Sequence, residues 1–110
     1  MTRLPGLPVN SLGGDAKKLL DAITGGKRGA GKPLSAFLGP DGTLQGPWDP
    51  LLRTPEIGDR VQALGEAVRF TSILPDQLRE LAILVCARHW RANYEWYAHA
   101  KIARAAGLPE

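Results

Sequence analysis

The chain has 110 residues, of which 44% are hydrophobic and 23% are charged, and its formal net charge is +3. This length suits one domain, and the ordinary composition excludes a wholly disordered chain. The longest apolar runs fall far short of the ~20 residues that span a bilayer, and the N-terminus opens no apolar signal-peptide core. We therefore expect a cytoplasmic protein that does not bind a membrane.

The charge distribution and the cysteine content exclude further classes. Residues 1–50 hold six Lys or Arg against four Asp, and residues 51–110 hold eight against seven acidic residues. A nucleic-acid-binding face usually clusters its basic residues more strongly, so we expect no nucleic acid partner. Cys86 is the only cysteine, which excludes an intrachain disulfide, a Cys-x-x-Cys redox pair and a zinc site built from cysteines of one chain.

The first 46 residues differ in composition from the rest of the chain. Ten of the thirteen glycines and five of the nine prolines lie at or before position 47. These residues interrupt regular structure and predict an irregular arm over residues 1–46, followed by a helical domain over residues 47–110. Within the arm, Asp15 is expected to cap one short helix that ends at Gly25 and Gly26.

Three local features mark the N-terminal half. Residues 25–32 (GGKRGAGK) predict a flexible basic loop. Residues 40–43 (PDGT) predict a tight turn. We expect Trp48, within the sequence PWDP, to anchor the arm to the helical domain.

Two long helices are predicted in the middle of the chain. The first covers about residues 55–70, with Thr54 as its cap and Pro55 in the first helical position. The second covers residues 75–90 and is apolar almost all round. That pattern predicts a central, largely buried helix.

A third helix is predicted over residues 94–106, with Asn93 as its cap and Gly107 as its stop. No segment shows the alternation of a half-buried strand, so the predicted fold class is all-α, a compact helical bundle. A chain this short buries only roughly 60–70% of its unfolded surface. We therefore expect oligomerisation to complete the bundle.

Glu80 is the first candidate for chemistry. On a helix its surface neighbours are Ile83, Leu84 and Ala87, so the carboxylate loses solvation. A carboxyl group in an apolar site can serve as a general acid or base. The alternative is a partly exposed Glu in the first turns of a helix, stabilised by the helix dipole.

His99 is the second candidate. Ile102 and Ala103 share its helix face, and Glu95 lies four residues before it, where its carboxylate can accept the ring N–H. A carboxylate that orients an imidazole suits general acid–base catalysis. The alternative is a core or interface histidine that Glu95 merely satisfies.

Other reactive residues are interpreted as structural. His89 lies on the side of its helix opposite Glu80 and is expected to be a packed histidine. Cys86 lies within a hydrophobic run and is expected to be a small buried hydrophobe, because no lysine or helix N-terminus is near in sequence to activate its thiol.

Two motifs resemble binding sites but fit poorly. Residues 26–32 match a phosphate-binding Gly-x4-Gly-Lys, yet Pro33 stands where Ser or Thr must bind magnesium, and a helix precedes the motif instead of a strand. Aromatic and basic residues alternate over residues 88–97 (RHWRANYEWY). Base stacking is one interpretation, but aromatics at helical spacing more often lie in a core or a subunit interface.

The second half of the chain combines into a longer pattern. Residues 79–85 (RELAILV) precede residues 94–99 (YEWYAH), and A-x-x-AGL follows at residues 103–108. Upstream segments that fit the same pattern are residues 46–52 (GPWDPLL) and 55–58 (PEIG). Residues 46–108 thus resemble the carboxymuconolactone decarboxylase family of the alkylhydroperoxidase-like superfamily.

The resemblance implies an all-helical fold that assembles as trimers or hexamers. In the peroxidase branch one helix bears a Glu, and the next opens with Cys-x-x-Cys and carries a His four residues after the second Cys. The corresponding residues here are Glu80, Ala92, Glu95 and His99. Both thiols are absent, so thiol peroxidase activity through such a pair is not expected. The decarboxylase branch also lacks the pair and relies on acid–base residues.

The resemblance therefore favours a small homo-oligomeric lyase without cofactor or metal. Its substrate would be a compact carboxylated lactone or a similar acid, whose loss of CO2 leaves an enolate that must be protonated at carbon. The resemblance implies Glu80, Glu95 and His99 as catalytic residues. His99 would donate the proton, Glu95 would orient its tautomer, and Glu80 would assist from the facing helix. Candidates for holding the substrate carboxylate by bidentate pairing are Arg53, Arg79 and Arg88.

Two alternatives remain open at the level of sequence. The chain is short for the family, which indicates a C-terminal truncation and favours a non-catalytic, homo-oligomeric interaction module. A basic nucleic-acid binder would instead use residues 25–32 as a flexible arm, and its affinity would fall steeply with salt.

Overall fold

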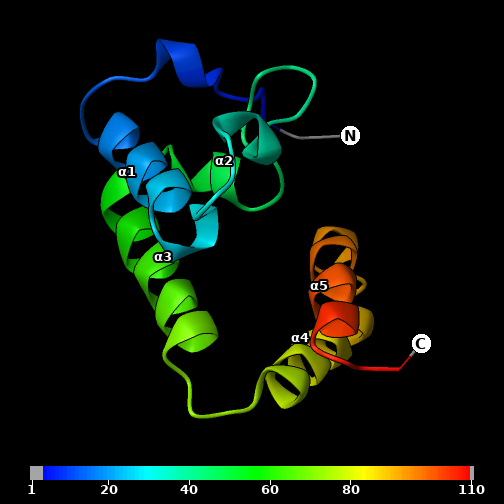
Figure 1. Cartoon of the computed structure of the whole chain (residues 1–110). Helices are drawn as coiled ribbons and strands as arrows, with labels where there is room; N and C mark the ends of the chain where they lie inside the picture. The colour runs from blue at the N-terminus through cyan, green and yellow to red at the C-terminus, as the bar shows by residue number, and fades with distance from the viewer. Residues whose placement is uncertain (1–3, 110) are drawn as a thin grey trace. The chain divides into compact units, whose positions relative to one another are not determined.

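The computed structural model describes residues 4–109 and shows an all-α protein (Figure 1). Among these residues the only β-type pairing is one isolated antiparallel bridge between Leu38 and Leu44. The chain divides into two compact parts, here called the N-terminal unit, Met1–Phe70, and the C-terminal unit, Thr71–Glu110. The sequence prediction placed its boundary after residue 46, so the two boundaries do not coincide. No helix in the described part of the chain has the length and apolarity needed to cross a membrane.

The described part of the N-terminal unit, residues 4–70, contains three α-helices and three short 3-10 helices. The α-helices are α1 (Gly14–Gly25), α2 (Trp48–Leu51) and α3 (Pro55–Phe70). The 3-10 helices are η1 (Val9–Ser11), η2 (Lys27–Gly29) and η3 (Leu34–Phe37). Helices α1 and α3 match the predicted elements. The prediction that Asp15 caps α1 is wrong, because Gly13 holds the cap position and Asp15 lies inside the first turn.

A small apolar core holds the N-terminal unit together. Most of its members come from the segment predicted as an irregular arm, and Trp48 of α2 packs against them. The buried core residues are Leu19, Leu20, Ile23, Leu44 and Leu52. The arm is thus a structured part of this unit, because its few apolar side chains converge on one face of α1.

Gly58 allows α3 to lie close to its neighbours. A Cβ atom at this position would stand 2.6 Å from Leu19 Cδ2 and 2.7 Å from the carbonyl oxygen of Leu51. No real side chain tolerates such contacts, so glycine sets the approach of α3 to α1 and α2.

The predicted flexible basic loop over residues 25–32 is wrong. Residues 27–29 form η2, in which Arg28 is buried. The Arg28 guanidinium donates hydrogen bonds to the side chain and the carbonyl of Gln62, and it lies 4.5 Å from the centre of the Trp48 ring. These contacts make Arg28 part of the packing of the N-terminal unit. Its side chain is therefore not part of a mobile arm that could bind nucleic acid.

The predicted turn at residues 40–43 is confirmed. Gly42 adopts a positive φ of 73°, and the amide of Gly39 donates to the carbonyl of Thr43. The Asp41 carboxylate accepts hydrogen bonds from the backbone N–H and the hydroxyl of Thr43.

The C-terminal unit is a helical hairpin. It consists of α4 (Asp76–His89) and α5 (Asn93–Ala105), joined by a short turn. Gln77 donates a 2.7 Å hydrogen bond to the carbonyl of Gly107 and ties the start of α4 to the end of α5. The prediction that Asn93 caps α5 is wrong, because Ala92 holds that position and Asn93 is already helical.

The predicted burial of α4 is also wrong. Only one face is covered within the hairpin, and the long apolar side chains Leu78 and Val85 are 54% and 60% exposed. Cys86 and His89 are exposed as well, which corrects their interpretation as packed residues. One partner helix shields a single face, so an all-round apolar sequence leaves much of its surface uncovered.

Candidate functional site

Glu80 and His99 face each other between the two helices of the C-terminal unit. The distance from Glu80 Oε2 to His99 Nδ1 is 2.7 Å, which is a short hydrogen bond. Glu80 is fully buried, and the side chain of His99 is 16% exposed. The interhelical contact therefore places a desolvated carboxylate directly on one nitrogen of an imidazole that solvent still reaches.

Arg79 is the second charged group beside Glu80. Its side chain is 9% exposed, and its Nε lies 3.5 Å from Glu80 Oε1. The two atoms have no hydrogen-bond partner within the described residues, so their attraction is that of an ion pair. Arg79 Nη1 also lies 2.8 Å from an oxygen of the exposed Asp76. The guanidinium thus lies where it can compensate the buried negative charge of Glu80.

Glu95 approaches the other nitrogen of the same imidazole. Its Oε2 lies 3.6 Å from His99 Nε2, and its side chain is 40% exposed. The structure therefore brings the three candidate residues together, but their geometry differs from the sequence-based assignment. Glu80 makes the close contact that was assigned to Glu95, because Glu80 enters from the facing helix whereas Glu95 stands one turn away on the same helix.

This arrangement assigns different tasks to the two ring nitrogens. An ionised carboxylate only accepts hydrogen bonds, so this contact favours the tautomer of His99 that carries its proton on Nδ1. Nε2 then remains as the nitrogen that can gain or lose a proton. Glu80 fixes the tautomer and the ring orientation, and Glu95 adjoins the exchanging nitrogen.

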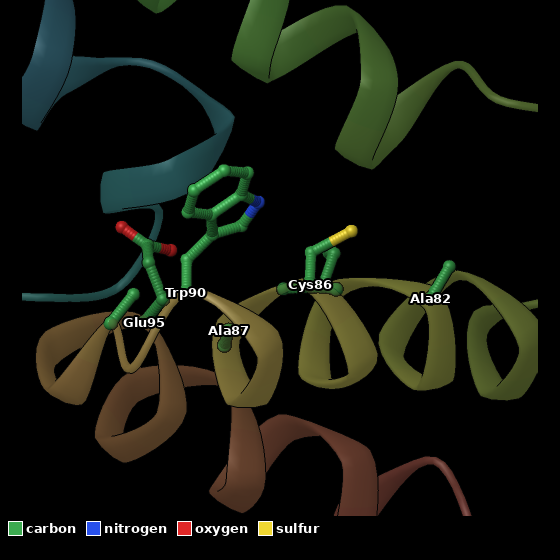
Figure 2. A pocket seen from close by; sticks show the side chains of 7 residues that line it. Ala82, Cys86, Ala87, Trp90 and Glu95 are labelled. Atoms are coloured by element: carbon green, nitrogen blue, oxygen red, sulfur yellow. The ribbon is translucent and has the colours of Figure 1, made fainter.

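An apolar groove adjoins the outer carboxylate. It has a volume of about 420 Å³, and Glu95 is the only ionisable group at its wall besides the thiol of Cys86. Its lining residues are Ala82, Ile83, Cys86, Ala87, Trp90, Ala92 and Glu95. Figure 2 shows Ala82 and Cys86 on α4, Trp90 directly after its end, and the carboxylate of Glu95 beside Trp90. The groove could hold the apolar body of a small molecule close to Glu95.

The structure distinguishes the three arginines considered for a substrate carboxylate. Arg79 is engaged with Glu80 and Asp76, and the Arg53 guanidinium bonds the carbonyl oxygen of Pro5 in the N-terminal unit. Arg88 is exposed at the end of α4. Sequence reasoning did not find that Arg79 balances Glu80, because adjacent residues on a helix do not ordinarily face each other.

No group of three or more His, Cys, Asp or Glu side chains within residues 4–109 is placed to hold a metal ion. Comparison of the chain with protein-family models, with curated proteins and with solved structures found no match. The interpretation of the site therefore rests on its own chemistry and on the sequence pattern.

Proposed function

We propose that Glu80 and His99 form the acid–base pair of a cofactor-free enzyme that decarboxylates a small carboxylated lactone or a similar acid. The reaction class follows from the resemblance to carboxymuconolactone decarboxylases. One observation carries the proposal: a fully buried carboxylate holds His99 Nδ1 at 2.7 Å. A carboxylate that orients an imidazole is the arrangement that general acid–base catalysis requires.

The proposed step begins with protonated His99. The bond between the substrate carbon and its carboxylate breaks, CO2 leaves, and the electron pair stays on the carbon as an enolate. His99 donates the Nε2 proton to that carbon and becomes neutral. Its Nδ1–H continues to donate a hydrogen bond to the Glu80 carboxylate. Glu95 is 40% exposed and lies 3.6 Å from Nε2. It would pass a proton from solvent back to His99 and so complete the cycle.

The proposal is tested with four chains: the parent, His99→Ala, Glu80→Gln and the matched control His89→Ala. CO2 release is measured over a panel of small carboxylated lactones. General acid–base catalysis contributes about 10²–10⁴-fold, so His99→Ala should lose that factor on any substrate that the parent turns over. His89 is exposed and contacts Trp90 edge-on at 5.0 Å, so its removal should leave the rate unchanged.

Two results would contradict the assignment. The first is full activity of His99→Ala on a substrate of the parent. The second is an equal loss in His89→Ala, which would show a general effect of histidine removal. Imidazole ¹⁵N shifts of the parent add an independent measurement, since the assignment requires a proton on Nδ1 of His99.

The non-catalytic interaction module is the second candidate, and exposed apolar side chains favour it. In α3, Ile57, Val61, Leu64 and Val68 recur at helical spacing and are all exposed. Such a stripe is typical of a face that packs against another helix. Sedimentation of the parent and of a Val61→Asp, Leu64→Asp double variant tests this candidate, which predicts a homo-oligomer that the double variant disrupts.

A further inference from the structure

A second pocket lies at the turn between α4 and α5. It has a volume of about 280 Å³, and it contains none of the residues of the Glu80–His99 site. Its lining residues are Ala87, Arg88, Arg91, Ala92, Asn93 and Trp96. Two arginines, one asparagine and one tryptophan thus line this pocket, and none of its lining residues within 4–109 carries a carboxylate.

Both arginines of this pocket are available to a ligand. Arg88 and Arg91 are exposed, and within residues 4–109 neither forms an ion pair or a side-chain hydrogen bond. Arg28 and Arg79, in contrast, are buried against partners of their own. Two arginines that line one pocket without an ion-pair partner among the described residues attract an anion, and the planar forks of their guanidinium groups suit a carboxylate or a phosphate.

The backbone of Arg91 gives a second, independent indication. Helix α4 ends in a Schellman motif, in which the amide of Ala92 bonds the carbonyl of Ala87 and the amide of Arg91 bonds that of Arg88. Helix α5 ends in the same motif, with Gly107 at a φ of 88° in the left-handed position. At the end of α4 this position holds Arg91, with a φ of 53°.

An arginine in that position is strained where glycine would be free. It is the only non-glycine residue with a positive φ among the described residues. Strain of this kind concentrates at functional sites. The side chain of Arg91 is therefore present at a conformational cost, and its guanidinium contributes positive charge to the pocket.

We propose that this pocket binds a small planar organic carboxylate. Arg88 and Arg91 would pair with the carboxylate, Asn93 would donate from its amide, and the ring or unsaturated body would lie against the indole of Trp96. The pocket is at the small end of ligand sites, which fits a ligand with a single ring. The proposal goes beyond the proposed reaction and does not depend on it, because no residue of the acid–base pair takes part.

The test titrates the full chain with benzoate at low ionic strength and follows the Trp96 indole N–H signal by NMR. The Trp96→Phe variant assigns that signal. Arg88→Gln and Arg91→Gly should each weaken benzoate binding by about tenfold or more, since a charge-assisted pair is worth at least that factor. Lys32→Gln, which removes an exposed charge of the N-terminal unit, should bind benzoate as the parent does.

Arg91→Gly also carries a signature that a merely structural role would not give. Glycine relieves the left-handed strain, so this variant should melt at a higher temperature than the parent although it binds benzoate less tightly. Opposite changes in stability and in binding would support the proposal.

Several results would overturn the proposal. Benzoate could bind Arg88→Gln and Arg91→Gly as tightly as the parent, or neutral benzamide could bind as tightly as benzoate. A response to inorganic phosphate without one to benzoate would reject the carboxylate class. An equal loss of affinity in Lys32→Gln would show that benzoate binding depends on the net charge of the chain and not on this pocket.

Discussion

The two units of this protein are stabilised in opposite ways. The N-terminal unit buries leucine and isoleucine side chains from α1 and from the loops around it. In the C-terminal unit the most deeply buried side chain is the carboxylate of Glu80, while Leu78 and Val85 on the same helix are largely exposed. One unit is a small apolar core, and the other is a hairpin closed around a charged pair.

This difference shows that hydrophobic content alone is a poor guide to burial in a short chain. The glycine-rich first half supplies only a few apolar side chains, but they converge on one core. The apolar second half supplies many, and a single partner helix covers only one face of α4. A buried charge in such a setting is tolerated because it has partners. Removing the charge or one of its partners should therefore destabilise the unit strongly.

The largest expected effect is the removal of the buried carboxylate. Glu80→Ala leaves Arg79 and His99 without their common partner, and breaking a buried ion pair costs about 3–5 kcal/mol. Hydrogen exchange should report this loss in the amides of α4 and α5. Glu95→Ala is the matched control, since Glu95 faces the same imidazole but is 40% exposed. A loss for Glu95→Ala as large as that for Glu80→Ala would contradict the assignment of the buried pair.

The apolar core of the N-terminal unit gives the second effect. Ile23 is fully buried in α1, and its truncation to Ala should cost about 2–5 kcal/mol through lost transfer energy and a cavity. Ile73→Ala is the control, because Ile73 is 99% exposed and surface substitutions change stability by only about ±0.5 kcal/mol. Denaturant unfolding measures both. Similar costs at the two positions would show that Ile73 is covered in solution.

A third prediction is that alanine has opposite effects on stability at two glycines of α3. Gly58→Ala forces a methyl group into Leu19 and the backbone of Leu51 and should cost about 1–3 kcal/mol. At Gly65 the atom nearest to an added Cβ is Arg28 Nη2 at 3.5 Å, which is an ordinary contact. Gly65→Ala should stabilise the helix by roughly 0.5–1 kcal/mol. Thermal unfolding of the two variants should therefore shift in opposite directions, and equal shifts would refute the close approach of α3 to α1.

Much of the secondary structure was predictable from the sequence, because it depends on local signals. Pro55 opens α3, Gly107 follows α5 in the left-handed conformation, and the turn at residues 40–43 contains Asp and Gly at suitable positions. The fixed, buried position of the Arg28 side chain was not predictable. It depends on Gln62 and Trp48, which are distant in sequence and meet only in the folded unit.

The candidate site shows the same limit. The helix period placed Glu80 and His99 on apolar faces, which made them candidates. It did not show that Glu80 lies closer to His99 than Glu95 does, because a contact between two helices depends on their register and crossing. The strained Arg91 was missed as well, since a left-handed arginine has no sequence signal apart from its place after a helix end.

The smallest expected effect lies in the turn of the N-terminal unit and depends on pH. Hydrogen bonds from the Thr43 hydroxyl and backbone N–H lower the pKa of Asp41 below its usual value of 3.8. A carboxyl group whose pKa falls on folding adds stability above its unfolded pKa, and that stability is lost as the pH falls through the folded pKa. Asp41→Asn should therefore melt slightly below the parent at neutral pH. The difference should vanish in acid, once Asp41 of the parent is protonated. Melting temperatures of both chains from pH 7 down to about pH 2 test this, and a difference that persists undiminished in acid would show that charge on Asp41 does not stabilise the turn.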